Sequence, residues 1–186
     1  MTPTALVPIA DGSEDIEAVT LIDVLRRAGV EVTVASAHDR LEIKAARATR
    51  IVADALVTEC VGKHYDLIAL PGGMPGAANL GDCEPLMAML KEHKTADRWF
   101  AAICAAPGVA LAPRGFLDGY AATAHPNFQQ ALPDKSRVHE RVVVDRNCIT
   151  SQGPGTALEF ALTLVEQVQG RAKRDEVAAP MVLPEP

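Results

Sequence analysis

The residue with the clearest chemical potential is a cysteine that ends an apolar run. Residues Trp99–Ile103 (WFAAI) are typical of a buried strand, and Cys104 follows them directly. Two alanines, a proline and a glycine come next, which predicts a sharp turn into a helix. The dipole and the free N–H groups at a helix N-terminus favour a thiolate, as in a thiol version of the nucleophile elbow. A buried cysteine that only fills space is the alternative interpretation.

The predicted first helix offers a carboxyl partner for this thiol. On a helical wheel, Glu17 falls on the apolar side with Leu21 and Val24. Burial raises the pKa of a carboxyl group, so we expect Glu17 to stay protonated near neutral pH and to act as an acid or base. Glu14 shares the apolar side but lies in the first turn, where a carboxylate complements the helix dipole. A partly exposed Glu on a helix flank is the alternative for Glu17.

Two further loops carry candidate functional residues. Gly72 and Gly73 follow the apolar run Asp66–Leu70, and residues without a Cβ let backbone N–H groups approach a bound group closely. Ordinary turn chemistry also explains this glycine pair. His125 follows the predicted strand Tyr120–Thr123 and is a candidate proton shuttle. A single loop histidine is, however, often only a surface residue.

Other chemistries lack their motifs. Cys60, Cys83 and Cys148 are far apart and form no C-x-x-C pair, so the sequence predicts neither a zinc site nor a disulfide framework. Cys148 lies in an apolar strand and is interpreted as a core residue. The stretch LPGGMPGA lacks the spacing of the dinucleotide fingerprint, and the chain has no G-K-[ST] phosphate loop. Nicotinamide cofactors and nucleotides are therefore not expected.

Strands and helices alternate along the chain, which predicts an α/β fold with a mostly parallel sheet and helices on both faces. In such sheets the ligand crevice lies beyond the carboxyl ends of the strands. Residues Glu42–Ala55 are interpreted as a strand pair or an extended excursion. The predicted strands are Ala5–Ala10, Val30–Ser36, Asp66–Leu70, Trp99–Ile103, Tyr120–Thr123, Arg141–Asp145 and Cys148–Ser151, and the predicted helices are Glu14–Ala28, Glu84–Lys94, a helix from about Ala105, and Thr156–Val168.

Composition sets the class of partner. The chain has 186 residues, of which 48% are hydrophobic and 23% charged, and these values fit one domain over residues 1–186. The net charge of -6 comes without any block of Lys or Arg, so there is no nucleic-acid-binding signature. No apolar run approaches the roughly 18 residues of a membrane span, and no leader pattern is visible. We expect a soluble, cytoplasmic protein with a small-molecule or protein partner.

Six blocks, in order along nearly the whole chain, resemble the ThiJ/PfpI superfamily. The resemblance is to the branch that holds the bacterial chaperone-like protein YajL and the Parkinson-disease deglycase. It implies a flavodoxin-like three-layer sandwich, a homodimer, Cys104 as the reactive thiol and Glu17 as its carboxyl partner. The blocks are ADGSEDIEAV, LRRAGVEVTVAS, DLIALPGG, AAICAAPGVALA, TSQGPGTALEFAL and EVAAPMVL.

The same resemblance implies substrate-binding positions. An oxyanion pocket would come from the backbone of Gly73 and Ala105, with His125 nearby. Arg27 and Arg47 match positions that help to bind anions near the subunit boundary. The EVAAPMVL tail resembles the extra helix that covers the cleft in this branch, which argues against the protease activity of more distant relatives.

Some positions depart from the pattern of the branch. Met74 stands where some relatives have a polar residue, which alters the polarity of the pocket. Ala45 and Val52 stand where relatives often carry further cysteines, so secondary redox sites are lost. His125 is not universal in the branch, which makes it an auxiliary group.

Two classes of function remain. As an enzyme, the protein would be a glyoxalase or deglycase in which Cys104 attacks methylglyoxal, glyoxal or a glycated protein, Glu17 moves the proton, and lactate or glycolate is released. Such a reaction needs no metal, glutathione or nucleotide cofactor. As an oxidative-stress sensor and redox-regulated chaperone, Cys104 would form a sulfinate without turnover. Both functions need an activated thiol beside a protonated carboxyl, so the sequence does not separate them.

Overall fold

A seven-stranded sheet forms the centre of the computed structural model, which describes residues 2–183. The strand order is β5-β2-β1-β6-β7-β9-β8, and every neighbouring pair is parallel except β8 and β9. The predicted mostly parallel sheet is therefore confirmed. The strands are β1 (Thr4–Ile9), β2 (Glu31–Ser36), β5 (Ala55–Leu56), β6 (Leu67–Leu70), β7 (Trp99–Ile103), β8 (Val142–Asp145) and β9 (Cys148–Ser151).

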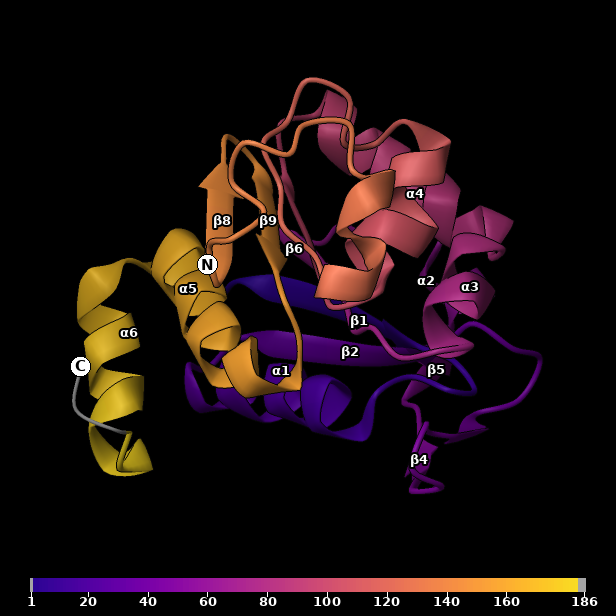
Figure 1. The fold of residues 1–186 in the computed structure, drawn as a ribbon. Coiled ribbons are helices and arrows are strands. Elements are labelled where there is room, and N and C mark those ends of the chain that lie inside the picture. The colour runs from indigo at the N-terminus through magenta and orange to yellow at the C-terminus, as the bar shows by residue number, and fades with distance from the viewer. Residues whose placement is uncertain (1, 184–186) are drawn as a thin grey trace.

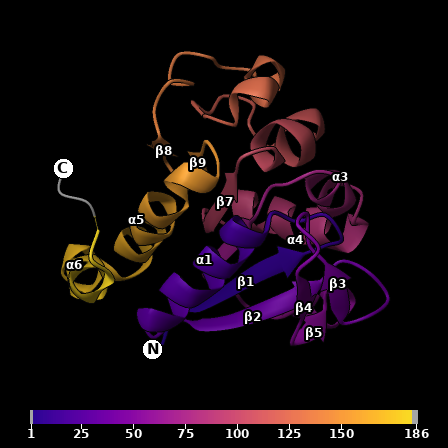
Figure 2. The ribbon, with the colours of Figure 1, turned by 60° about the horizontal axis from the view of Figure 1, so that its bottom comes forward.

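Helices cover both faces of the sheet, which gives the flavodoxin-like three-layer sandwich (Figures 1 and 2). On one face α1 packs against α5, and on the other α3 packs against α4. Strands buried on both faces must be apolar throughout, as the fully buried β6 shows. The helices are α1 (Asp15–Arg27), α2 (Val57–Cys60), α3 (Gly76–Gly81), α4 (Glu84–Thr95), α5 (Ala157–Gln169) and α6 (Arg171–Ala178).

The sheet order brings distant loops to one edge. Strands β1, β6, β7 and β9 are consecutive and parallel, so the segments that follow each of them leave the sheet side by side. These segments begin at Ala10, Pro71, Cys104 and Gln152. The loops that contain the candidate residues therefore meet at the carboxyl edge.

The strand pair predicted within Glu42–Ala55 is confirmed, whereas the predicted strand after it at Tyr120 is not. The Glu42–Ala55 segment is a separate antiparallel hairpin of β3 (Glu42–Lys44) and β4 (Arg50–Val52), followed by β5. The predicted strand Tyr120–Thr123 is wrong, since this segment makes only an isolated bridge between Ala121 and Asp134. Side chains take the N–H groups that a ladder would use: Asp145 accepts from Ala121, and Thr150 accepts from Thr123.

The predicted helix after Cys104 is not an α-helix. It consists of a π-helix, η1 (Pro107–Leu111), and a 3-10 helix, η2 (Ala112–Arg114). The N–H of Ala112 donates to the carbonyl of Pro107, which is the wider π spacing. Pro113 lies within η2, and Gly115 ends it in the left-handed conformation with φ 72°. Further 3-10 helices are η3 (Pro126–Ala131), η4 (Pro154–Thr156) and η5 (Ala179–Met181).

The C-terminal tail does form an extra helix, but it does not cover the predicted cleft. Helix α6 packs against α5 at the side of the molecule (Figure 1). None of the described tail residues lines the cavity that contains Cys104. Within residues 2–183, no helix has the length and apolar character needed to span a membrane.

A buried histidine ties α4 to the start of β7. His93 is 2% exposed, and its Nδ1 lies 3.0 Å from the carbonyl oxygen of Trp99. Burial lowers the pKa of His93 to about 4, with a further contribution from the charge of Arg98. The folded state therefore holds His93 neutral, while the unfolded chain binds its proton near the ordinary pKa of 6.5.

We predict that His93 makes the fold acid-sensitive. Between about pH 6.5 and 4 the unfolded state binds more protons, so stability present above pH 6.5 is lost as the pH falls. The loss from this residue reaches roughly 2 kcal/mol at pH 5. His93→Gln should flatten the free energy of unfolding against pH in urea titrations over this range, whereas the exposed His139→Gln should not. Equal pH slopes for the wild type and His93→Gln would contradict the assignment.

Candidate active site

Cys104 lies in a strained turn directly after β7. Its φ is 66°, in the left-handed region that non-glycine residues rarely adopt. Two backbone hydrogen bonds hold the turn: Cys104 N donates to Ser151 O at 3.0 Å, and His125 N donates to Cys104 O at 2.9 Å. The residue is 8% exposed and lines a cavity, so a reagent can approach it there.

The two glycines after β6 approach this turn too closely for any side chain. A Cβ on Gly72 would lie 2.6 Å from the Cβ of Cys104. Gly73 has φ 85°, and a Cβ there would lie 2.4 Å from Gly12 O. The backbone N–H groups of Gly73 and Ala105 lie near the Cys104 sulfur and act to lower the pKa of its thiol. The glycine pair therefore brings backbone donors against the thiol.

Glu17 points into the protein from α1, as the helical wheel predicted. It is 0% exposed, and its Oε2 accepts a hydrogen bond from Gly72 N at 2.8 Å. The other oxygen, Oε1, is buried and accepts no hydrogen bond from a described residue. The Cys104 thiol is nevertheless close enough to lower the pKa of the Glu17 carboxyl. Burial raises the pKa of Glu17 to about 7. The Glu17 carboxyl is therefore about half protonated at pH 7 and mostly protonated below it.

The thiol and the carboxyl titrate as a pair. Burial and the negative charge of Glu17 raise the pKa of the Cys104 thiol to about 12, against the N–H groups that lower it. The expectation that a helix N-terminus makes this thiol acidic is wrong, because the segment behind it is a five-residue π-helix and the pKa is raised. Above about pH 7 the pair carries one negative charge and one proton. A thiolate forms when that proton moves to Glu17.

His125 lies beside the thiol and lines the same cavity. Its Nδ1 accepts a hydrogen bond from Asn127 N at 3.3 Å, so the neutral ring carries its proton on Nε2. Gly153 leaves space between the two groups: a Cβ there would lie 3.5 Å from His125 Cδ2 and 4.0 Å from Cys104 Sγ. The imidazole therefore faces the cavity next to the reactive sulfur.

The cavity above Cys104 has a volume of about 310 Å³. Arg47 lines it, whereas Arg27 does not: Arg27 lies at the end of α1, where its Nε is 2.6 Å from the carboxylate of Asp23. The predicted substrate-binding role of Arg27 at this site is therefore not supported by its position. The lining residues are Glu14, Ala46, Arg47, Gly73, Met74, Cys104, Ala105, His125, Phe128 and Pro154.

Glu14 differs from its sequence interpretation. It is the N-cap of α1 rather than a first-turn residue, it is 8% exposed, and it lines the cavity. Phe128 and Pro154 also line the cavity, and neither was predicted from the sequence. Pro154 follows β9 at the carboxyl edge of the sheet. Knowledge that β9 lies next to β7 would have placed Pro154 near Cys104. Phe128 lies in the 3-10 helix after His125, and no local pattern marks it.

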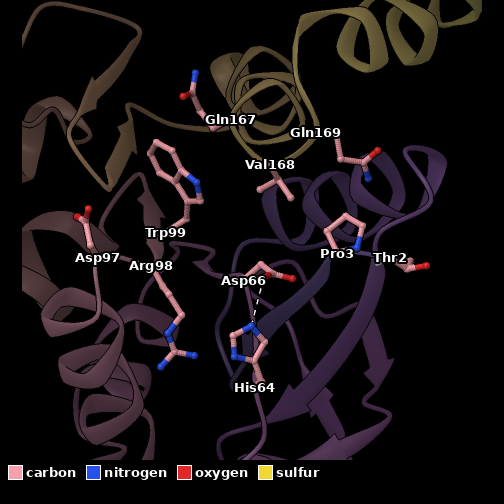
Figure 3. Close-up of a pocket in the computed structure, with 10 residues that line it drawn as sticks. All are labelled: Thr2, Pro3, His64, Asp66, Asp97, Arg98, Trp99, Gln167, Val168 and Gln169. Carbon is pink, nitrogen blue, oxygen red and sulfur yellow. Dashed lines mark hydrogen bonds and ion pairs between the residues drawn. The ribbon is translucent and has the colours of Figure 1, made fainter.

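The other cysteines lie outside this cavity, and all four are free. Cys148 is 1% exposed in the core, as predicted. Larger hollows also lie elsewhere: a groove of about 620 Å³ at the amino ends of β1, β6 and β7 contains His64, Asp66 and Trp99 (Figure 3). Within residues 2–183, no three His, Cys, Asp or Glu side chains come together as a metal-ligand set.

Comparison with known proteins identifies relatives of this chain. The chain is 46% identical over 172 residues to Protein DJ-1 homolog A of Arabidopsis thaliana, covering 92% of this chain but only 44% of that protein. It is 34% identical to the glutathione-independent glyoxalase DJR-1.2 of Caenorhabditis elegans, covering 96% of this chain and 94% of that one.

Among solved structures, the oxidized form of Toxoplasma gondii DJ-1 superposes with a TM-score of 0.96 at 43% identity, covering 99% of this chain and 100% of that one. The sequence model of the DJ-1/PfpI family matches residues 3–167. The predicted resemblance to the ThiJ/PfpI superfamily is thereby confirmed, and the chain belongs to the DJ-1/PfpI family.

Proposed function

We propose that this protein is a cysteine-dependent glyoxalase that converts methylglyoxal to lactate, or glyoxal to glycolate, without metal, glutathione or nucleotide. The observation that supports this most directly is the fully buried Glu17, with a pKa of about 7, beside the Cys104 thiol. A relative from C. elegans is a glutathione-independent glyoxalase. The cavity of about 310 Å³ is large enough for a three-carbon aldehyde.

The first step forms a bond between sulfur and carbon. The Cys104 thiol transfers its proton to Glu17, and the thiolate attacks the aldehyde carbon of methylglyoxal. The aldehyde oxygen gains the electron pair of the C=O π bond and takes the proton back from Glu17, which gives a neutral hemithioacetal and leaves Glu17 as a carboxylate. Gly73 and Ala105 line the cavity beside the sulfur, and in this scheme their N–H groups stabilise the charge that develops on this oxygen.

The second step moves a proton between neighbouring carbons. The Glu17 carboxylate removes the C–H proton of the former aldehyde carbon, and an enediolate forms across the two carbons. The hydroxyl proton passes from the oxygen of the first carbon to the oxygen of the second, and protonated Glu17 returns its proton to the second carbon, which gives the lactate thioester of Cys104. Water then attacks the thioester carbon, and lactate and the free thiol are released. Methylglyoxal and one water are consumed for each lactate, so no oxidant or reductant is needed.

His125 and the cavity rim have auxiliary roles in this scheme. The Nε2–H of His125 is a donor that can stabilise the substrate's second oxygen. Met74 is 49% exposed at the rim and supplies an apolar contact for a methyl group. The same thiol addition would act on early glycation adducts of proteins, which is the proposed deglycase activity. The chemistry needs a free thiol, which favours the reducing cytoplasm as its location.

The alternative function is an oxidative-stress sensor and chaperone. Cys104 would accept two successive oxygen atoms from peroxide, each releasing water, and end as a sulfinate held by Glu17 and the N–H donors. One observation favours this reading: the similar T. gondii DJ-1 was solved in an oxidized form. In this function the modified cysteine reports the stress, and no product is released.

We also propose that the protein is a homodimer. Ile16 and Val19 on α1 are 55% and 50% exposed, and Leu158 on the adjoining helix α5 is 43% exposed. Val52 on the β3–β4 hairpin is 65% exposed. Apolar side chains of this size on neighbouring elements favour burial against a second copy.

The first prediction concerns the pH dependence of the thiol. Cys104 should react with iodoacetamide faster as the pH rises through about 7, and the rate should then level off, because the pair loses its first proton there. Peptide mass spectrometry would follow Cys104 against the buried Cys148, whose labelling should be far slower. In Glu17→Gln the step near pH 7 should disappear. A wild-type rate that rises steadily to pH 10 without this step would exclude the coupled pair.

The second prediction separates the two functions. Glu17→Gln keeps the shape and a donor but cannot move a proton, so lactate formation from methylglyoxal should fall by roughly 100-fold or more. Cys104→Ser should abolish turnover. Peroxide should still convert Cys104 to the sulfinate in Glu17→Gln, and Glu92→Gln on the exposed side of α4 serves as the matched control. If pure wild-type protein forms the sulfinate but no lactate at any rate above buffer, the sensor function is favoured instead.

The third prediction tests the dimer. In sedimentation at micromolar concentration, the protein should have twice the 19.7 kDa mass of one chain. Val19→Asp places a charge on the exposed face of α1 and should shift the protein toward monomer, because a buried unpaired carboxylate opposes association. Val61→Asp, at a 56% exposed position after α2, should leave the mass unchanged. A wild-type monomer at these concentrations would contradict the proposal.

A further inference from the structure

One wall of the Cys104 cavity does not come from the main sheet. Ala46 and Arg47 lie in the loop between β3 and β4, and both line the cavity. We call residues 45–49 the hairpin loop. Ala48 adopts φ 70°, and Ala45 N donates to Thr49 O at 2.8 Å, so the loop is a tight turn with its own internal bond. Its position relative to Cys104 must be set by contacts with another segment.

That other segment is the start of α1. Ala46 N donates to Ser13 O at 2.8 Å, and Arg47 N donates to the carboxylate oxygen Oδ2 of Asp15 at 2.8 Å. Asp15 supplies the side-chain contact that holds the backbone of Arg47. Its pKa is raised by burial, but hydrogen bonds from Thr49 and from the Arg47 backbone outweigh burial and hold the pKa below its ordinary value. The acceptor is therefore a carboxylate, which makes the bond to Arg47 charge-assisted.

Arg47 is the one Lys or Arg among the described residues that line the cavity. It is exposed, and the interaction found for it within residues 2–183 is the backbone bond to Asp15, so its side-chain charge is available to a ligand. Glu14 lines the same cavity, and Glu17 lies below it. If the hairpin loop moved away, Glu14 and the single negative charge that Glu17 and Cys104 share above about pH 7 would leave the cavity negative, and an anionic reactant would be repelled.

We infer that Asp15 is a positioning residue: it holds Arg47 at the cavity and thereby gives the Cys104 site a preference for anionic over neutral carbonyl compounds and alkylating agents. The substrate class that benefits is an aldehyde with a carboxylate or another anionic group beside the reacting carbon. The inference rests on the proposal that Cys104 reacts from this cavity. It does not require glyoxalase turnover, since any reaction of the thiol reports it.

The test uses two reagents that differ in charge. Alkylation of Cys104 by iodoacetate and by iodoacetamide is measured by peptide mass spectrometry. The rate with anionic iodoacetate is divided by the rate with neutral iodoacetamide, and this ratio is then divided by the same ratio for free cysteine. Asp15→Ala should lower this normalised ratio by roughly two- to fivefold, the effect expected of one partly screened charge. Arg47→Gln should lower it equally, and the double variant should show no further loss. Added salt should lower the wild-type ratio but not that of Asp15→Ala.

Asp66→Ala is the matched control. Asp66 also accepts a backbone N–H, from Thr4 at 2.7 Å, but it lies in the groove at the opposite edge of the sheet (Figure 3). The Asp66→Ala substitution changes the net charge by the same amount as Asp15→Ala and should leave the normalised ratio of alkylation rates unchanged. If Asp15→Ala does not fold, Asp15→Asn retains a neutral acceptor and should give an intermediate ratio.

The outcomes are distinct. An unchanged ratio in the Asp15 variants, with a lowered ratio in Arg47→Gln, would overturn the positioning role. An unchanged ratio in all variants would overturn charge selection by this cavity. An unreactive Cys104 in the wild type would instead contradict the proposed function itself.

Discussion

Burial of the Glu17 carboxyl is the constraint on which the site depends. A carboxyl group with no exposed surface is stable only if it keeps its proton or finds donors, and here one donor, the N–H of Gly72, reaches it. That N–H is available because Gly72 has no side chain and lies directly against Cys104. The position of the carboxyl, the glycine pair and the turn at Cys104 therefore depend on one another. Loss of the Glu17 side chain would leave the buried N–H of Gly72 without its acceptor.

The sheet makes this arrangement possible because it fixes four chain segments at one edge. β6 and β7 are neighbours in register, with Leu70 opposite Ala102, so the glycines and the cysteine leave the sheet almost together. α1 returns from β1 and directs Glu17 beneath them. The left-handed backbone of Cys104 costs free energy, and its bonds to Ser151 and His125 hold it in place. The stability of the core thus supports a locally unfavourable conformation.

Much of the fold could be predicted because its signals are local. Apolar runs such as DLIAL identified the central strands, and the helical wheel placed Glu17 inward. What failed depends on contacts distant in sequence. Tyr120–Thr123 is not a strand because side chains from β8 and β9 take its N–H groups, and Glu14 lines the cavity because the hairpin and the loop after β6 enclose it. Arg27 shares the site's helix but lies three turns away from Glu14, which a one-dimensional match does not reveal.

The donors at the reactive sulfur are backbone N–H groups, and this has a consequence for how the protein can change over evolution. At Ala105 only proline would delete the N–H, and Gly73 admits no side chain without a shift of the backbone, so few substitutions can alter this part of the site without disturbing the fold. The rim is different, since Met74, Phe128 and Pro154 contribute side chains. New substrate ranges are therefore open to single changes at the rim, while the reacting centre stays as it is.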